Sequence, residues 1–378
     1  MGQGPLAGVR VIELAGLGAA PFAAMLLADL GAHVLRLERG DPDAAATANW
    51  DLLARSRHSV AVDLKCPAGR DLVLELCERA EVLIEGFRPG VAERLGVGPE
   101  AVGARNPRLV YGRMTGWGQR GPLAARAGHD INYIAVSGAL WPVGRAGAAP
   151  VPPLNYVGDF GGGALYLVMG VLAGLVHARR TGEGQVVDAA MVDGSASLTA
   201  MTHALMAAGF WHEERGVNIL DTGAPFYDVY ETSDGAYVAV GAIEAQFYAN
   251  LLEGLGLDAA DLAPQMERAQ WPGLRERFAA IFRTRTRDEW VERFEGVDAC
   301  VSPVLSPSEA PVHPYNRERG VFSTAERVEP MPAPRFSATP NPAPRPAQPA
   351  GAGTREGLIS WGLDEARLAE LRAAGAFG

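Results

Sequence analysis

Short apolar runs of strand length alternate with stretches of helical spacing through the first part of the chain. Five runs predict buried strands, at residues 9–14, 33–37, 81–85, 109–114 and 185–191. Helical spacing is found at residues 21–30 and 69–79. A strand, a helix and a second strand within about 30 residues form a parallel crossover unit. The pattern therefore predicts fold class α/β, a Rossmann-like open sheet with helices on both faces.

The pattern changes after a helix expected at residues 196–210. Apolar and polar positions then alternate at residues 226–231 and 237–240 around Ser233-Asp234-Gly235, which predicts a hairpin in a smaller α+β domain. Residues 330–353 are rich in proline and predict an extended strap, and residues 364–373 a final helix. We predict a large domain at residues 1–200 plus 330–378 and a small domain at residues 225–310. A linker at residues 201–224 and a return linker at residues 311–329 connect them.

Composition and charge narrow the class of protein. Hydrophobic residues make up 48% of the chain, enough for sizeable cores. The net charge of −10 argues against nucleic acid or anionic lipid as partners. Residues 160–176 carry no charge, but three leading glycines shorten the helical part, so we expect a core helix and no membrane span.

The cysteines and the N-terminal segment bear on the compartment. Cys66, Cys77 and Cys300 show neither Cys-x-x-Cys nor zinc-ligand spacing, so reduced thiols and no metal are expected. The first residues lack a basic segment followed by an apolar one, which argues against a signal peptide. We therefore predict a cytoplasmic protein.

Basic residues follow successive predicted strands. They are Arg39, Lys65, Arg88 and Arg94. Ligands of open α/β sheets bind at the carboxyl ends of strands, so four cations there indicate a polyanionic ligand. Gly16-Leu17-Gly18 follows the first strand but lacks the third glycine of a dinucleotide fingerprint. An NADP oxidoreductase is therefore a disfavoured alternative, and a tight turn into a helix begun by Pro21 is the preferred interpretation.

Three residues are candidates for acid–base chemistry. His129 lies in GHDINY and titrates near neutral pH; Asp159 precedes three glycines; Glu244 follows an apolar strand. Each has an ordinary structural alternative. Asp159 and Glu244 are placed to interact with a helix N-terminus, and His129 is compatible with a core imidazole.

Several long tracts carry a resemblance to a known family. They are GFRPGVAERLG (86–96), YGRMTGWGQRGP (111–122), AGHDINYIA (127–135), PPLNYVGDFGGGALYL (152–167), GEGQVVDAAMVDG (182–194) and GAPFYDVYETSDGAYVAVGAIEAQFY (223–248). With them the chain resembles the α-methylacyl-CoA racemases, isomerases within the family III CoA-transferase group. The resemblance runs over most of residues 5–335.

The resemblance implies a reaction and its residues. His129 and Asp159 would act as two bases on opposite faces of a 2-methylacyl-CoA in 1,1-proton transfer through an enolate, with Glu244 orienting the imidazole. No cofactor is implied, because CoA is part of the substrate and the thioester acidifies the α-proton. The alternative is a CoA-transferase with Asp159 as nucleophile. It is disfavoured because residues 221–227 lack a glycine-rich run and because the transferases lack this histidine.

The resemblance also implies how the substrate is bound. It assigns the CoA moiety to Arg39, Val62, Asp63, Leu64, Lys65, Gly86, Phe87, Arg88, Arg94, Gly128, Asp130, Ile131, Asn132 and Tyr133. We suggest the backbone amide of Asp130 as a donor to the enolate oxygen. The family further implies an interlocked homodimer in which Glu244 is supplied by the partner chain, and a role in lipid and fatty acid metabolism.

Overall fold

The computed structural model describes residues 3–40, 51–325 and 327–377. The chain forms two compact units, and the first of them contains three segments: Met1–Ser137, Leu154–Leu198 and Gly320–Gly378. The second contains Gly138–Pro153 and Thr199–Arg319. The first unit holds the parallel sheet, and the second a smaller antiparallel sheet.

The six strands of the large sheet in the first unit all run parallel, in the order β3-β2-β1-β4-β5-β6. Their bounds are β1 Arg10–Leu14, β2 His33–Glu38, β3 His58–Ala61, β4 Val82–Glu85, β5 Val110–Thr115 and β6 Val186–Ala190. This order is that of a doubly wound sheet, in which the direction of winding reverses between β1 and β4. The predicted α/β open sheet is confirmed.

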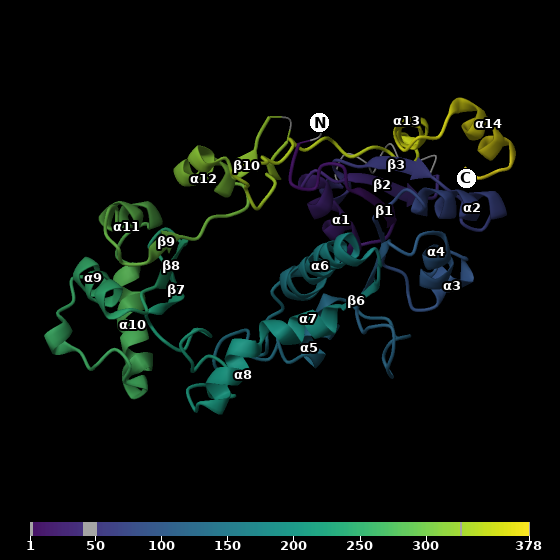
Figure 1. Cartoon of the computed structure of the whole chain (residues 1–378). Helices are drawn as coiled ribbons and strands as arrows, with labels where there is room; N and C mark the ends of the chain where they lie inside the picture. Colours follow the sequence, from purple (N-terminus) through teal and green to yellow (C-terminus); the bar gives the residue numbers. More distant parts are fainter. Residues whose placement is uncertain (1–2, 41–50, 326, 378) are drawn as a thin grey trace. The chain divides into compact units, whose positions relative to one another are not determined.

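Helices cover both faces of this sheet, as Figure 1 shows. Successive strand residues point to opposite faces, so Val11 and Val34 join one core and Ile12 and Leu35 the other. The first core lies under α1 (Ala19–Asp29) and α6 (Leu165–Thr181). The second lies under α2 (Pro67–Cys77), α13 (Thr354–Ser360) and α14 (Glu365–Ala373). Two-sided burial explains why the strands read as continuous apolar runs.

The long uncharged segment is the start of a core element. A π-helical stretch, Tyr156–Ala164, leads directly into α6. In the described residues, Tyr156–Thr181 is the one helix that is long and apolar enough to cross a membrane, a property shared by core helices of soluble proteins. Leu167 and Val171 are fully buried in the first core. The prediction of a core helix is thereby supported, and no clear membrane span emerges.

The proline-rich strap covers the outer edge of the sheet. The backbone N–H of Ser59 in β3 donates to Gln348 (3.1 Å), and that of Ala61 donates to the Thr354 hydroxyl (2.9 Å). Figure 1 shows the yellow C-terminal segment beside β3. An edge strand with free N–H groups invites pairing with other chains, and the strap satisfies these groups.

The second unit is built on a three-stranded antiparallel sheet, β7 (Tyr227–Glu231), β8 (Tyr237–Gly241) and β9 (Val301–Pro303). The predicted hairpin is β7–β8. Its helices are α8 (Ala200–Ala207), α9 (Ala245–Leu255), α10 (Trp271–Phe282), α11 (Arg287–Arg293) and α12 (Pro314–Arg319). An aromatic core contains Phe226, Phe278 and Trp290.

The helix predicted over residues 196–210 is wrong as a single element. The structure has α7 (Met191–Leu198) in the first unit and α8 in the second, with Thr199 between them. Apolar spacing continues through Thr199, so the sequence pattern gave no indication of the break. The remaining elements of the first unit are α3 (Val91–Arg94), α4 (Pro99–Arg105) and α5 (Asp130–Val136), with a short ladder of β10 (Phe322–Ser323) and β11 (Glu329–Pro330).

Candidate active site

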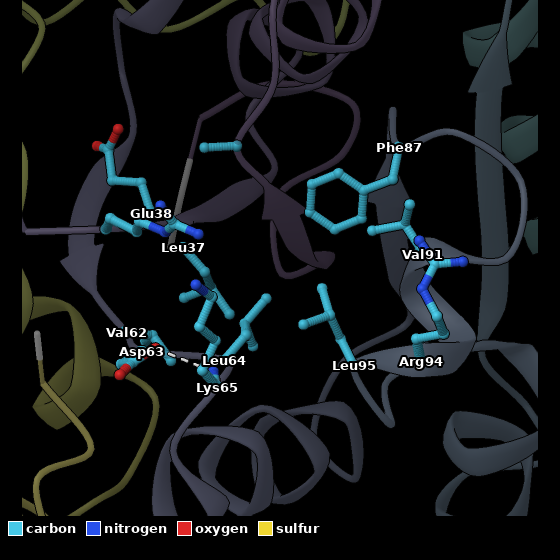
Figure 2. A pocket seen from close by; sticks show the side chains of 12 residues that line it. Leu37, Glu38, Val62, Asp63, Leu64, Lys65, Phe87, Val91, Arg94 and Leu95 are labelled. Atoms are coloured by element: carbon cyan, nitrogen blue, oxygen red, sulfur yellow. Dashed lines mark hydrogen bonds between the residues drawn. The ribbon is translucent and has the colours of Figure 1, made fainter. Parts of the chain in front are cut away.

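A cavity of about 500 Å³ lies at the carboxyl ends of the sheet strands in the first unit (Figure 2). One wall consists of residues from the ends of β2 and β3, and the facing wall of residues after β4 and from α3. Seven of the residues predicted to hold CoA line it: Arg39, Val62, Asp63, Leu64, Lys65, Phe87 and Arg94. Gly86 and Arg88 are neighbours of Phe87 in sequence but do not line the cavity.

Three cations and two carboxylates, Glu38 and Asp63, line this cavity together with apolar side chains. Arg39, Lys65 and Arg94 are exposed at the ends of three separate segments, while Leu64 and Phe87 are half-buried. The Asp63 carboxylate accepts the backbone N–H of Lys65 at 2.9 Å and fixes the turn that follows β3. Apolar walls with a few placed cations suit a flat, polyanionic ligand.

A buried ion-pair network holds the second wall. The Glu85 carboxylate, fully buried at the end of β4, accepts the backbone N–H of Phe87 (2.6 Å) and the Nε–H of Arg113 (2.8 Å). Arg113 also donates to Glu93 on α3 at 2.7 Å. Burial raises the pKa of the Glu85 carboxyl, and the Arg113 guanidinium opposes that rise. Neither Glu85 nor Arg113 was predicted; the available signal was a charge inside a buried strand run.

His129 and Asp159 are connected through Asp130. His129 precedes α5, and its backbone N–H donates to the Asn132 side chain at 3.0 Å. The buried Asp130 side chain accepts the backbone N–H of Asp159 at 2.7 Å. The start of α5 is therefore tied to the π-helical turn that carries Asp159. The His129 side chain is exposed in this chain.

Asp159 lies in an environment that favours its protonated form. Burial raises the pKa of the Asp159 carboxyl and the Asp130 charge adds to the rise; a hydrogen bond from Asn155 (3.3 Å) and the His129 imidazole oppose it. The loop Gly16-Leu17-Gly18 abuts this carboxyl, because a Cβ on Gly18 would lie 3.4 Å from its Oδ2. Gly18 has a positive φ of 69°, as a tight turn allows, but the helix that follows begins at Ala19 and not at Pro21.

Tyr133 connects the same region to Arg88. Burial raises the pKa of the Tyr133 hydroxyl, Asp159 adds to the rise, and Arg88 opposes it. The hydroxyl donates to the carbonyl of Gly128, where a Cβ would lie 2.8 Å from the Tyr133 ring. Glycine is therefore required at position 128 for this packing. Of the other predicted residues here, Ile131 and Asn132 are exposed.

Glu244 belongs to the second unit, whereas His129 and Asp159 belong to the first. It immediately precedes α9, is exposed, and makes no side-chain hydrogen bond to that helix. The ordinary alternative, a negative charge at the N-terminus of a helix, is compatible with this position. Within the described parts of the chain, no group of three or more His, Cys, Asp or Glu side chains is arranged to hold a metal ion.

The chain belongs to CoA-transferase family III, whose model matches residues 6–354. It is 46% identical to the α-methylacyl-CoA racemase of Mus musculus, over 97% of this chain and 96% of the relative. The racemase of Homo sapiens is also 46% identical, with coverage of 89% and 87%. The resemblance stated from the sequence is confirmed.

The fold is also that of solved structures. A CAIB/BAIF family protein from Brucella suis superimposes with a TM-score of 0.82 at 24% identity, covering 95% of this chain and all (100%) of that one. A hypothetical protein from Mycobacterium tuberculosis gives a TM-score of 0.77 at 25% identity, with coverage of 93% and 98%. At 24% identity, the likeness to the Brucella suis protein shows the fold alone.

Proposed function

We propose that the chain is an α-methylacyl-CoA racemase, which interconverts (2R)- and (2S)-2-methylacyl-CoA thioesters. The observation that carries the proposal is the hydrogen bond between the Asp130 carboxylate and the Asp159 backbone, which holds two candidate proton-transfer groups at one place in a chain 46% identical to such racemases. A histidine and a carboxyl group held close together are what a two-base proton transfer needs.

The proton transfer requires two groups of opposite protonation state. The α-proton of a thioester leaves from one face of the carbon and returns to the other, and one base cannot readily reach both faces. Neutral His129 removes the proton while the Asp159 carboxyl donates one, and the pair exchanges roles in the reverse direction. The raised pKa of Asp159 supports the protonated starting form.

The enolate formed between the two transfers needs hydrogen-bond donors at its oxygen. The first residues of a helix have backbone N–H groups without a partner inside the helix, and Asp130 is the first residue of α5. We assign its amide to the enolate oxygen. No metal or organic cofactor enters this scheme, since CoA is part of the substrate.

The CoA moiety occupies the cavity of the first unit. Arg39 and Lys65 bind the adenosine phosphates, Val62, Asp63 and Leu64 the adenine edge, and Gly86, Phe87, Arg88 and Arg94 the pyrophosphate region. The pantetheine arm then runs past Gly128, Ile131, Asn132 and Tyr133 to the reacting carbon. The electrostatic influence of Arg88 on Tyr133 supports this route, since it connects the two segments.

The active enzyme is an interlocked homodimer, in which the partner subunit's Glu244 orients His129. Exposed apolar side chains on α6 and β6 support the proposal that a partner subunit covers this face of the chain. Leu165 is 52% exposed, Met169 59% and Val186 49%. Exposed apolar patches of this kind mark interaction surfaces. We also place the enzyme in the cytoplasm, where free thiols such as Cys66, Cys77 and Cys300 are typical, and assign it to the metabolism of branched fatty-acyl thioesters.

The test is isotope exchange with one epimer of a 2-methylacyl-CoA in deuterated buffer and no acceptor acid. We expect deuterium at the α-carbon together with the opposite epimer. His129→Ala and Asp159→Ala each abolish formation of the opposite epimer while CoA binding persists, and the exposed controls His177→Ala and Asp288→Ala retain activity. Full turnover in either active-site variant contradicts the two-base scheme. No exchange in the wild type, combined with an acyl-enzyme trapped by hydroxylamine, identifies a CoA-transferase with Asp159 as nucleophile.

A further inference from the structure

A second cavity, of about 390 Å³, lies at the opposite end of β2 and β3 from the CoA cavity. His33 and His58 are the first residues of these strands, whereas the CoA cavity is lined by Glu38 and by residues after Ala61. At about 3.3 Å per residue, the six residues of β2 separate the two cavities by roughly 16 Å. The strap residues Pro342, Ala343 and Arg345 complete the lining with Ser360 of α13.

The polar side chains of this cavity have unused hydrogen-bonding capacity. His58 is 7% exposed, and its Nδ1 is buried with no hydrogen-bond partner. The Ser360 hydroxyl gives its one hydrogen to the carbonyl of Gly357 at 2.6 Å and lies 3.2 Å from Nε2 of His33. Nε2 of His33 is therefore the donor in that contact, which leaves its Nδ1 as the site of protonation.

Cationic side chains dominate the surroundings. Arg345 donates to the backbone carbonyl of Ser56 at 3.2 Å, and its charge acts on both imidazoles. Arg10 acts on His33 in the same sense, and the acidic group that acts on His58 is Glu356 of α13. No Asp or Glu is among the described residues that line the cavity.

We propose that this cavity is a second ligand site, which binds the phosphate or carboxylate group of a small anionic metabolite between His33, His58 and Arg345. A buried imidazole nitrogen without a partner gains a hydrogen bond to an acceptor when it carries a proton, and the nearby guanidinium favours an acceptor with negative charge. A metal ion does not suit the position, because Arg345 would repel it and only two of the lining residues are conventional ligands.

Binding of an anion changes the pKa values of His33 and His58, whereas binding of an uncharged molecule in the cavity supplies no charge that favours the imidazolium form. Burial, the neighbouring His58 and the Arg10 and Arg345 charges lower the pKa of His33 to about 4, and burial and Arg345 also lower the pKa of His58. An anion between the rings favours the imidazolium form and raises the pKa of either ring by about one unit or more. The ligand therefore changes the protonation of the rings as it binds.

The experiment is a titration of the full-length protein with inorganic phosphate or acetate, with saturating CoA to occupy the first cavity. Long-range ¹⁵N–¹H spectra report the protonation of His33 and His58. We expect the pKa of His58 to rise in wild type and in Arg355→Gln, an exposed control in the same C-terminal segment, and not in Arg345→Gln. A response to phosphate alone identifies a phosphate-bearing ligand, and a response to acetate alone a carboxylate.

Two results overturn the proposal: no change with either anion, or an unchanged response in Arg345→Gln. Arg345 also holds Ser56, so the folding of that variant is checked by its Tm. Ser360→Ala provides a second variant, because it removes the hydroxyl that fixes His33 and leaves the strap contacts of Arg345 in place. Weaker anion binding in Ser360→Ala with an unchanged Tm supports the site, and undiminished binding in both variants argues against it.

Discussion

Replacement of Arg113 by methionine tests the buried ion pair that supports the cavity wall around Phe87. Glu85 is fully buried, and Arg113, itself 6% exposed, is its charged partner at 2.8 Å. Removal of one member of a buried pair leaves an uncompensated charge and costs about 3–5 kcal/mol. The contact between Arg113 and the half-exposed Glu93 adds little, because exposed ion pairs contribute about 0–1 kcal/mol. We therefore expect Arg113→Met to lower the free energy of unfolding of the first unit by about 3 kcal/mol or more.

The loss depends on pH in a defined direction. Burial raises the pKa of Glu85 above its ordinary value of 4.5, and loss of Arg113 raises it further. A carboxyl group whose pKa is higher in the folded state than in the unfolded state stabilises the folded state fully at pH values below its unfolded-state pKa. This contribution to the free energy of unfolding is lost as the pH rises through its folded-state pKa. Arg113→Met is therefore most destabilised at pH 7 to 8 and approaches wild type near pH 4.

Hydrogen exchange followed by mass spectrometry measures this loss locally. Peptides that cover β4 and β5 should lose protection by roughly a hundredfold or more at pH 7, since 1.4 kcal/mol is a factor of ten. Arg105→Met is the matched control, because Arg105 pairs with Glu78 at 3.0 Å on the surface, with side chains 53% and 44% exposed. Glu85→Gln in the Arg113→Met background should restore most of the protection, because an amide still accepts from Phe87. Equal effects of Arg113→Met and Arg105→Met would refute the reasoning.

Three further changes test the site and the packing. Asn155→Leu removes the hydrogen-bond donor that lowers the pKa of Asp159, so Asp159 stays protonated to higher pH. In the direction where Asp159 donates the proton, the fall in racemisation rate at high pH therefore moves to higher pH. A pH–rate profile in which this fall stays at the same pH contradicts the prediction. Gly194→Ala places a Cβ 1.8 Å from the carbonyl oxygen of Gly162 and should cost about 3 kcal/mol, seen as a large fall in Tm. Gly103→Ala, with nothing within 4 Å of the new Cβ, should stabilise α4 by about 0.5–1 kcal/mol and raise Tm.

The parallel sheet was predictable because its inner strands β1, β4 and β5 are buried on both faces. In β4, for example, the buried Val82, Leu83 and Ile84 form an apolar run in the sequence, and short connections place such strands in parallel crossover units. The cations at the strand ends followed from the same reasoning, since carboxyl ends of parallel strands share one edge. Local spacing therefore identified several residues that line the cavity at this edge of the sheet.

Interactions between distant segments of the chain could not be predicted from local spacing. Asp130 is assigned from the sequence through its backbone amide, yet the structure uses its side chain to hold Asp159, 29 positions further along the chain. A hydrogen bond between segments so far apart leaves no periodic trace. The break at Thr199 is similar, because the residues around it have ordinary helical spacing and the division arises from which unit each half packs on.

A different signal was present in the strands themselves. Glu13, Glu85 and Arg113 each stand inside a fully buried strand segment, where a charge is tolerated only with a partner. The structure pairs Glu85 with Arg113, and Glu13 with Arg57 at 2.6 Å. A charge within an apolar strand run therefore predicts a buried ion pair, although not its partner. In this chain Glu85, paired with Arg113, also accepts a hydrogen bond from the loop after β4. The two charges inside apolar strand runs therefore stabilise the wall where we propose that CoA binds.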